Sequence, residues 1–356
     1  MKLPVHLFLF SLLVLTFLGC GEASSPTTTP TFLLSPEPRS TSTIAPTEAS
    51  AVPLVAGQWN YLFFNPRLNQ VVLVNGGPDG DKPATDPLEL WTWDGFDWSL
   101  LSADPQGPAW RNFAGAAYDS ERDRLVIYGG VQNRNSRMEE TWEWDGQSWT
   151  RFDVAGPGYR EGAAMVYDEA RGNTILFGGA NEKFEILGDT WAWDGTSWTQ
   201  VSAAGPSPRF PSAFVYDPAR EKVLLFSGHF VSENSYITFS DFWEWDGTSW
   251  KEIIVEGEKP GARNIATMTF NPLDETVLLF GGGEEKFLGD LWSWNGEAWT
   301  QVTESGVPPR SGLGGVYDSQ RKWLVVFGGV EKPGGKAITD TWEWDGNTWV
   351  CVYRCK

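Results

Sequence analysis

The chain is poor in the side chains that most often carry enzyme chemistry. Its 356 residues include two histidines, His6 and His229, and three cysteines, Cys20, Cys351 and Cys355. A Cys-His nucleophile, a Ser-His-Asp triad and a multi-histidine metal centre are therefore not expected. The sequence indicates no cofactor and no metal, and no catalytic residue stands out.

Basic residues are also scarce. The chain has 27 lysines and arginines against 46 aspartates and glutamates, a formal net charge of −19. Such a surface repels nucleic acids and anionic lipid headgroups and favours solubility. We expect no nucleic-acid partner, whereas basic partners and divalent cations stay open.

Tryptophan, by contrast, is abundant and regularly placed. Most of the 21 tryptophans fall in a cassette, Trp-x-Trp-[Asp/Asn]-Gly-x-x-Trp, whose six copies begin at Trp91, Trp142, Trp191, Trp243, Trp292 and Trp342. A period of about 50 residues indicates a repeat protein. Because residues i and i+2 of a strand share a face and Asp-Gly turns a hairpin, each cassette predicts two antiparallel strands. The fixed place of the rings favours packing between repeats over a carbohydrate-stacking site.

A second hairpin precedes each cassette. It is clearest from Ala163 to Tyr167, and from Thr174 to the glycine pair Gly178-Gly179. Six repeats of four antiparallel strands predict an all-β, closed six-bladed β-propeller over residues 58–356. The expected blades are 58–101, 108–152, 157–201, 206–254, 260–302 and 307–353. No strand is left over, so we expect the first and last blades to close the ring through side-chain packing.

The repeat resembles the kelch motif: a glycine pair, a variable stretch, an acidic residue, then Trp-x-Trp-Asp and a later tryptophan. The acidic residue is present in all six copies, as Glu89, Glu140, Asp189, Asp241, Asp290 and Asp340. The fourth copy departs from the motif with Ser227-Gly228. The resemblance covers residues 58 to 353 and implies the galactose oxidase-like kelch superfamily. A copper site of the galactose oxidase kind needs histidines and an internal cysteine that this chain lacks.

The N-terminus reads as an export signal. Residues 1–19 carry Lys2 and an apolar run too short for a typical membrane span, and Gly19-Cys20 resembles a bacterial lipobox. We expect a lipid on Cys20 and a disordered Ser/Thr/Pro-rich tether over 20–57. The protein would then be a monomeric lipoprotein facing the periplasm or cell exterior, touching the membrane only through its anchor. Cleavage by a general signal peptidase would instead give a secreted soluble protein.

The two C-terminal cysteines form either a disulfide or two free thiols. Four residues of continuous strand span about 13 Å, which exceeds the reach of a disulfide. A Cys351–Cys355 bridge therefore requires Val352 to Arg354 to turn.

Strand parity places the long, dissimilar loops, among them His229 to Asp241, on one face of the propeller, where function on rigid scaffolds concentrates. The inner strands should line a central channel with small residues such as Ala114 to Ala117. Five arginines precede the inner strands on the same face: Arg111, Arg160, Arg209, Arg263 and Arg310. Resemblance to peptide-binding kelch domains implies that they contact acidic ligand groups; the alternative is an ion pair with the acidic residue before the cassette. Six aromatic residues could supply apolar contacts, Trp110 being the expected exposed tryptophan: Trp110, Tyr159, Phe184, Phe210, Tyr236 and Phe287.

The sequence thus favours a non-catalytic module of the cell envelope that binds a protein, peptide or glycan. One alternative is a carbohydrate-active hydrolase or lyase using carboxylates at the channel mouth, although no spacing singles out a pair. A second is a structural component of the envelope. His229 could be a lone acid or base, but a loop histidine is more often a bystander.

The anchor is directly testable. We expect a fatty-acid probe to label the wild-type protein and not Cys20→Ser, because only the Cys20 thiol can accept the diacylglyceryl group. Mass spectrometry of the mature N-terminus is the second measurement. Equal labelling of both proteins, or a mature N-terminus elsewhere, contradicts the anchor.

Overall fold

The computed structural model describes residues 60–76, 85–132, 136, 138–304 and 306–355. The chain divides into two units, Met1–Ala45 and Pro46–Lys356, and every described residue belongs to the second. The expected signal peptide, Cys20 and the tether lie outside the described residues. Within them, no helix is long and apolar enough to cross a membrane.

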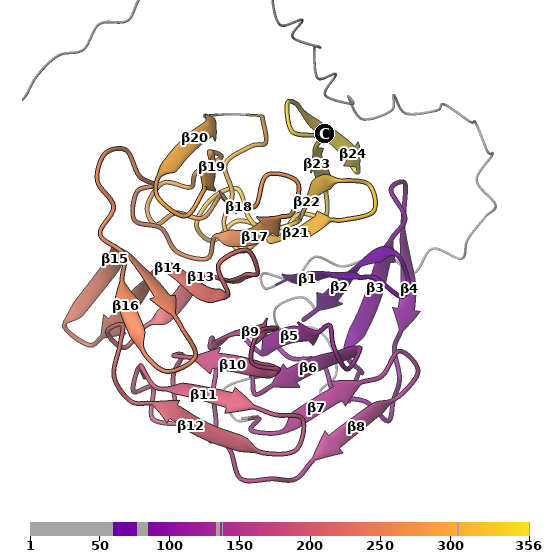
Figure 1. Cartoon of the computed structure of the whole chain (residues 1–356). Coiled ribbons are helices and arrows are strands. Elements are labelled where there is room, and N and C mark those ends of the chain that lie inside the picture. The colour runs from indigo at the N-terminus through magenta and orange to yellow at the C-terminus, as the bar shows by residue number, and fades with distance from the viewer. Residues whose placement is uncertain (1–59, 77–84, 133–135, 137, 305, 356) are drawn as a thin grey trace, which may run out of the picture. The chain divides into compact units, whose positions relative to one another are not determined.

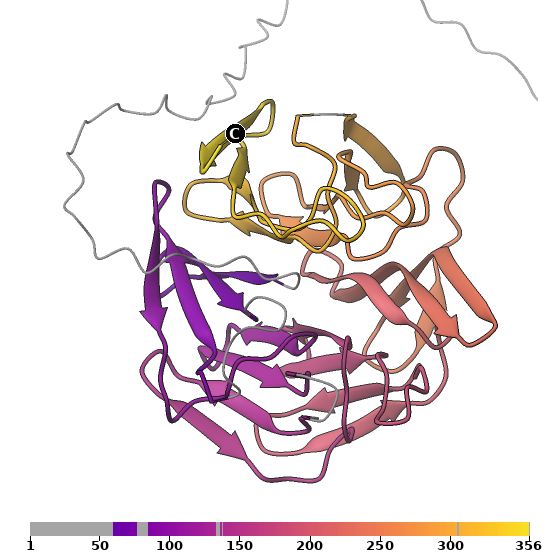
Figure 2. The same ribbon diagram turned by 180° about the vertical axis from the view of Figure 1, so that it is seen from behind.

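The described residues form six four-stranded antiparallel sheets, which we call blades one to six in chain order (Figures 1 and 2). Each blade takes four consecutive strands. The strands of blades one to three are β1 (Asn60–Asn65), β2 (Gln70–Asn75), β3 (Glu89–Trp93), β4 (Trp98–Ser102), β5 (Gly115–Asp119), β6 (Arg124–Tyr128), β7 (Thr141–Trp144), β8 (Trp149–Phe152), β9 (Ala164–Asp168), β10 (Asn173–Phe177), β11 (Thr190–Trp193) and β12 (Trp198–Ser202). Those of blades four to six are β13 (Phe210–Asp217), β14 (Lys222–Ser232), β15 (Ser235–Trp245), β16 (Trp250–Glu252), β17 (Thr267–Asn271), β18 (Thr276–Phe280), β19 (Leu291–Trp294), β20 (Trp299–Thr303), β21 (Gly314–Asp318), β22 (Trp323–Phe327), β23 (Thr341–Trp344) and β24 (Trp349–Tyr353). The predicted six-bladed propeller is confirmed.

The Asp-Gly turn of each cassette is held by its own side chain. In blade three, Asp194 Oδ1 accepts the backbone N–H groups of Thr196 and Ser197 at 2.7 and 2.8 Å, and Gly195 takes φ +92°. Burial raises the pKa of Asp194, but hydrogen bonds from the Thr196 hydroxyl and from these two backbone N–H groups outweigh it and lower the pKa to about 2. Asn295 makes the same two bonds in blade five, so asparagine serves the turn equally well.

The apolar core lies between blades rather than within them. Six clusters each join two neighbouring blades. Tyr128 of blade two, for example, packs with Trp193 and Trp198 of blade three. A buried indole removes about 200 Å² from water, worth about 5 kcal/mol gross at about 25 cal/mol per Å². The prediction that the cassette tryptophans pack between blades is confirmed.

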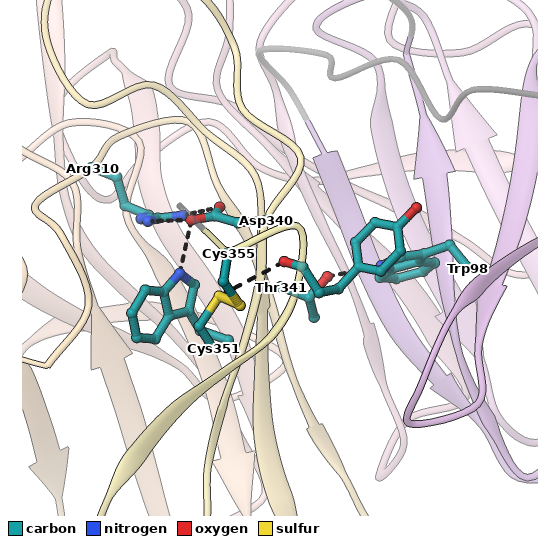
Figure 3. Close-up of a disulfide and its surroundings, with 8 residues drawn as sticks. Trp98, Arg310, Asp340, Thr341, Cys351 and Cys355 are labelled. Carbon is teal, nitrogen blue, oxygen red and sulfur yellow. Dashed lines mark hydrogen bonds and ion pairs between the residues drawn. A yellow bond between two sulfur atoms is a disulfide. The ribbon is translucent and has the colours of Figure 1, made fainter. Parts of the chain in front are cut away.

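The ring closes where blade six meets blade one. Trp98 of β4 packs edge-on against Phe327 of β22, with ring centroids 5.0 Å apart. Trp93 Nε1 donates to Glu343 at 2.8 Å. Trp98 Nε1 donates to Thr341 Oγ1 at 2.9 Å, and this second pair is drawn in Figure 3. No strand is exchanged between the two sheets, because β1–β4 and β21–β24 each stay together. Closure through side-chain packing is therefore confirmed.

The third tryptophan of a cassette reaches the preceding blade, and its indole nitrogen is bonded where that blade offers a hydroxyl. The bonded pairs, each at 2.8–2.9 Å, are Trp98–Thr341, Trp198–Thr141 and Trp250–Thr190. In the other three blades an apolar residue stands where these blades have threonine. The tryptophans and the apolar residues that face them are Trp149 and Leu90, Trp299 and Phe242, and Trp349 and Leu291. The indole nitrogens of these three are buried with no hydrogen-bond partner among the described residues. One residue of the neighbouring blade therefore decides whether each indole is satisfied.

The C-terminal cysteines are bridged. Cys351 and Cys355 form a disulfide with a Cα–Cα distance of 5.8 Å, in the last blade near Thr341 (Figure 3). Arg354 turns the chain at φ +46° directly after β24 ends, which supplies the turn that the bridge requires. Of the two alternatives drawn from the sequence, the structure contains the disulfide.

We expect Thr341→Val to lower the free energy of unfolding by about 1–3 kcal/mol, because it leaves the buried indole nitrogen of Trp98 without an acceptor. Thr341→Ser is the matched control, since it keeps the hydroxyl and loses only a methyl group. Chemical denaturation of the three proteins measures the difference. An equal loss in both variants would mean that the hydrogen bond contributes nothing to closure.

Candidate functional site

The two faces of the propeller differ in their connections. Turns from first to second and from third to fourth strands lie on one side, the turn face. Connections from second to third strands and between blades lie on the other, the loop-rich face. In five blades the two middle strands have four to six residues each.

Blade four breaks this pattern. The segment from His229 to Asp241, expected to be a loop, is instead a β-hairpin, because β14 and β15 each run for eleven residues and pair as far as Ser232 and Ser235. The signal is present in the sequence. Aromatic and β-branched residues flank Glu233-Asn234 on both sides, with no glycine or proline to end a strand.

The five arginines of the loop-rich face are buried, each at 3% exposure or less. Each guanidinium meets the acidic residue that precedes the cassette of its own blade. The pairs, at 2.6–3.3 Å, are Arg111–Glu140, Arg160–Asp189, Arg209–Asp241, Arg263–Asp290 and Arg310–Asp340. Each arginine also donates to the backbone carbonyl 18 residues further on.

These contacts leave the arginines little capacity for a ligand. In Arg160 every N–H group has a partner: the Pro157 and Gly178 carbonyls and the Asp189 carboxylate. An acidic ligand would have to displace Asp189 from a buried bidentate pair. The arginines therefore take the ion-pair alternative, and they do not form the accessible ring that the sequence suggested.

The glycine pair allows the next blade to come close. A Cβ on Gly129 or Gly178 would lie 2.5 or 2.6 Å from the carbonyl oxygen of the following blade's arginine, and both glycines have positive φ. Blade four places Ser227 here at φ +63°. Its hydroxyl oxygen accepts the Arg263 N–H at 3.0 Å and lies 2.8 Å from the Arg263 carbonyl. The hydroxyl thus binds the same backbone segment that a glycine would admit.

Comparison with known proteins agrees with this geometry. Residues 142–310 match the family model of the KLHDC2/KLHL20/DRC7 Kelch-repeats domain. The matched repeats, which run from β7 to the segment before β21, are kelch repeats. The solved structure of YjhT superposes with a TM-score of 0.63 at 16% sequence identity, over 84% of this chain and 98% of YjhT, which shows a shared fold. No curated protein matches the sequence. The kelch propeller fold alone does not select a function.

The six aromatic candidates of the kelch propeller separate into two groups. Trp110 and Tyr159 are buried, at 3% and 7% exposure. The expected exposure of Trp110 is wrong. Its backbone N–H donates to the Asp86 carbonyl at 2.9 Å, and this bond holds the segment against blade one. The others are accessible on the loop-rich face: Phe184 at 63% exposure, Tyr236 at 52%, and the half-buried Phe210 and Phe287.

His229 lies in strand β14, within an aromatic stack. Its ring centroid is 5.1 Å from that of Phe210 and 5.5 Å from that of Tyr236, and both pairs are stacked. The Tyr236 hydroxyl accepts a hydrogen bond from Asn264 Nδ2 at 2.7 Å. Burial lowers the pKa of His229, against the opposing charge of Glu284, so the ring is neutral at neutral pH. His229 is therefore better described as a packing residue of the hairpin than as an acid or base.

The six inner strands of the kelch propeller surround a central channel of about 620 Å³. Small residues such as Ala116, Ala163 and Gly314 line it, as predicted. Arg111 and Glu169 are the charged residues of this lining among those that the structure describes. The carboxylate pair that a hydrolase or lyase would need is therefore missing from the described channel wall. No group of three or more His, Cys, Asp and Glu in the described part of the chain could hold a metal ion.

We expect Arg209→Met to lower the free energy of unfolding at pH 7 by about 3–5 kcal/mol, because it leaves the Asp241 carboxylate without its ion-pair partner. The matched control is Lys251→Met, which removes an exposed ion pair with Glu244 and should cost at most about 1 kcal/mol. Chemical denaturation measures both. Equal losses would show that the buried pair has no special role.

The same pairs predict the response to acid. Burial raises the pKa of Asp189 and of Asp241, but hydrogen bonds from arginine and tryptophan outweigh it, so both pKa values are lowered. Their stabilisation is full above the unfolded pKa of about 3.9 and is lost as the pH falls through the folded values. Thermal melts between pH 7 and pH 2 should show this loss, and a shallower one in Arg209→Met. Parallel curves would exclude Asp241 as a contributor.

Proposed function

We propose that this kelch propeller is a non-catalytic binding module, exported and anchored through Cys20, whose loop-rich face contacts a protein partner. The observation that carries the proposal is the hairpin of β14 and β15. It extends the two middle strands of blade four well beyond their counterparts in the other blades. A propeller that served only as a structural component would need no such extension of one blade.

The exposure of side chains supports this choice of face. The hairpin carries three exposed apolar or aromatic side chains, Val231, Tyr236 and Ile237, at 37%, 52% and 46% exposure. Blade three contributes Phe184, which is 63% exposed. The turn face also carries exposed apolar residues, including Phe96 at 67%, but these occupy short turns. Scattered apolar residues are normal on a soluble surface, whereas a group on one projecting element favours an interface.

The rigidity of the face supports it too. The buried arginine pairs fix the start of the inner strand and the entry to the third strand in five blades. A rigid base of this kind limits the entropy lost on binding to the elements that project from it. The hydrolase alternative gains no support, because Glu169 is the single carboxylate of the described channel lining.

The test is site-specific photo-crosslinking in the native host. We expect a photoreactive phenylalanine at position 184 or 236 to give a discrete adduct with a partner, because both side chains project from the loop-rich face. Phe96 is the matched control, since it is as exposed as Phe184 but lies in a turn on the opposite face. Adducts of equal yield from all three positions, or from position 96 alone, would reject the loop-rich face as the binding surface.

A further inference from the structure

We propose that the outer edge of β15, between Ser235 and Ser240, receives an extended basic segment of the partner protein as an added β-strand. The inference rests on the proposed function for its choice of face and names the partner's chemistry. It starts from a mismatch in strand length within blade four. β15 has eleven residues, whereas the outermost strand, β16, has three and pairs with Trp243–Trp245. The next residue, Ile253, donates its backbone N–H to the Phe242 carbonyl at 2.8 Å, and the pairing goes no further toward Ser235. The first part of β15, from Ser235 to Ser240, therefore extends beyond its neighbour.

The register shows which backbone groups point to this open edge. In blade three, the residues at the positions of Phe210 and His229 are Glu161 and Ala180. The backbone N–H of each donates to the carbonyl of the other, at 3.1 and 2.9 Å. His229 therefore directs its N–H and C=O toward β13, and Thr238, directly opposite it on β15, directs its own groups away from β14. Tyr236, two residues earlier, does the same. Among the described residues, no backbone group bonds to Tyr236 or Thr238 on that side.

The edge lacks the usual protection against pairing. Exposed edges are commonly blunted by proline, by lysine or by a covering segment. The sequence from Ser235 to Ser240 is Ser-Tyr-Ile-Thr-Phe-Ser, which contains no proline, glycine or charge and is rich in strand-forming residues. An unprotected edge of this composition is the surface that strand addition requires.

Apolar contacts are available beside the edge. A cleft of about 70 Å³, between blades four and five, is lined by Ser240, Phe242, Ile254 and Trp299 among others. Ile254 is 77% exposed and Ile237 46%. Side chains of an added strand alternate between the two sides of the sheet. Those on one side would reach the cleft, and those on the other would cover Ile237.

Charge identifies the class of partner. The hairpin tip and the neighbouring segments are mainly acidic. Their exposed acidic residues are Glu233, Glu252, Glu256, Glu258, Glu284 and Glu285, and their exposed basic residues are Lys251, Lys259 and Lys286. The whole chain has a net charge of −19. A second copy would bring the same negative groups together, whereas a lysine- or arginine-bearing strand would be attracted. The occupant is therefore a basic, extended segment of another protein.

The probe is a fluorescein-labelled peptide of eight residues that alternate lysine and valine. Three comparison peptides replace lysine by glutamate, methylate alternate backbone nitrogens, or collect the lysines into one block. Fluorescence anisotropy at physiological salt should show binding of the alternating lysine peptide at least tenfold tighter than that of each comparison peptide. Amide hydrogen exchange should show new protection at Tyr236 and Thr238.

Thr238→Pro tests the edge itself. The substitution removes the backbone N–H of residue 238, which points away from β14, and leaves the hydrogen bonds between β14 and β15 intact. The fold should therefore be kept, while the affinity for the alternating lysine peptide should fall at least tenfold. Thr238→Val is the matched control: it removes the hydroxyl that donates to Glu284 but keeps the N–H, and it should bind within about twofold of the wild type. Melting temperatures of the variants verify that both are folded.

Four results would overturn the inference. They are equal binding of the methylated or block peptide, no binding of the alternating peptide, unchanged affinity of a folded Thr238→Pro, and a homodimer that Thr238→Pro abolishes. A failure of this inference can be distinguished from a failure of the proposed function. If crosslinks at Phe184 persist in Thr238→Pro with unchanged yield, the loop-rich face binds a partner and the β15 edge does not.

Discussion

The structure depends on the burial of tryptophan rings between neighbouring blades. Among the described residues no blade has a core of its own, since the six apolar clusters found there each span two blades, including the cluster at the seam between blades six and one. Each blade is therefore stable only against its neighbours, and closing the ring supplies the missing neighbour for both terminal blades. The indole nitrogen of the third cassette tryptophan also needs a hydrogen-bond acceptor. One residue of the preceding blade supplies it when that residue is threonine and leaves the nitrogen unsatisfied when it is apolar.

On the loop-rich face, the buried arginines carry out a second structural task. Each joins the start of an inner strand to the entry of the third strand of the same blade. The backbone carbonyls of Arg160, Arg209 and Arg310 also lie against a glycine of the preceding blade. This arrangement uses the polar groups nearest the channel for stability. Recognition then falls to whatever projects beyond them, which in the described part of this chain is chiefly the hairpin of blade four.

Part of the inner strand edges is covered by contacts between neighbouring blades. At the centre, side chains of one blade bond the backbone of the next: Ser212 Oγ accepts the Ala266 N–H at 3.1 Å, and Thr269 Oγ1 accepts the Tyr317 N–H at 3.0 Å. The C-terminal strand is secured by the disulfide next to the seam. Among the described residues, the start of β15 has no such backbone contact on its outer edge.

The sequence by itself determined the number of blades, their strands, the interblade place of the cassette tryptophans and the way the ring closes. These depend on local patterns, such as i and i+2 periodicity and Asp-Gly turns, repeated six times, so each copy supports the others. Tertiary structure decided the rest. A sequence cannot tell whether Arg160 and its counterparts meet Asp189 and its counterparts or a ligand, since that depends on the burial created by the next blade. Trp110 is enclosed by a contact with Asp86 of blade one, and His229 is stacked because β14 continues past the point where the other blades turn. Residues distant in the chain become partners only when neighbouring sheets pack, and that packing is what a repeat pattern alone does not specify.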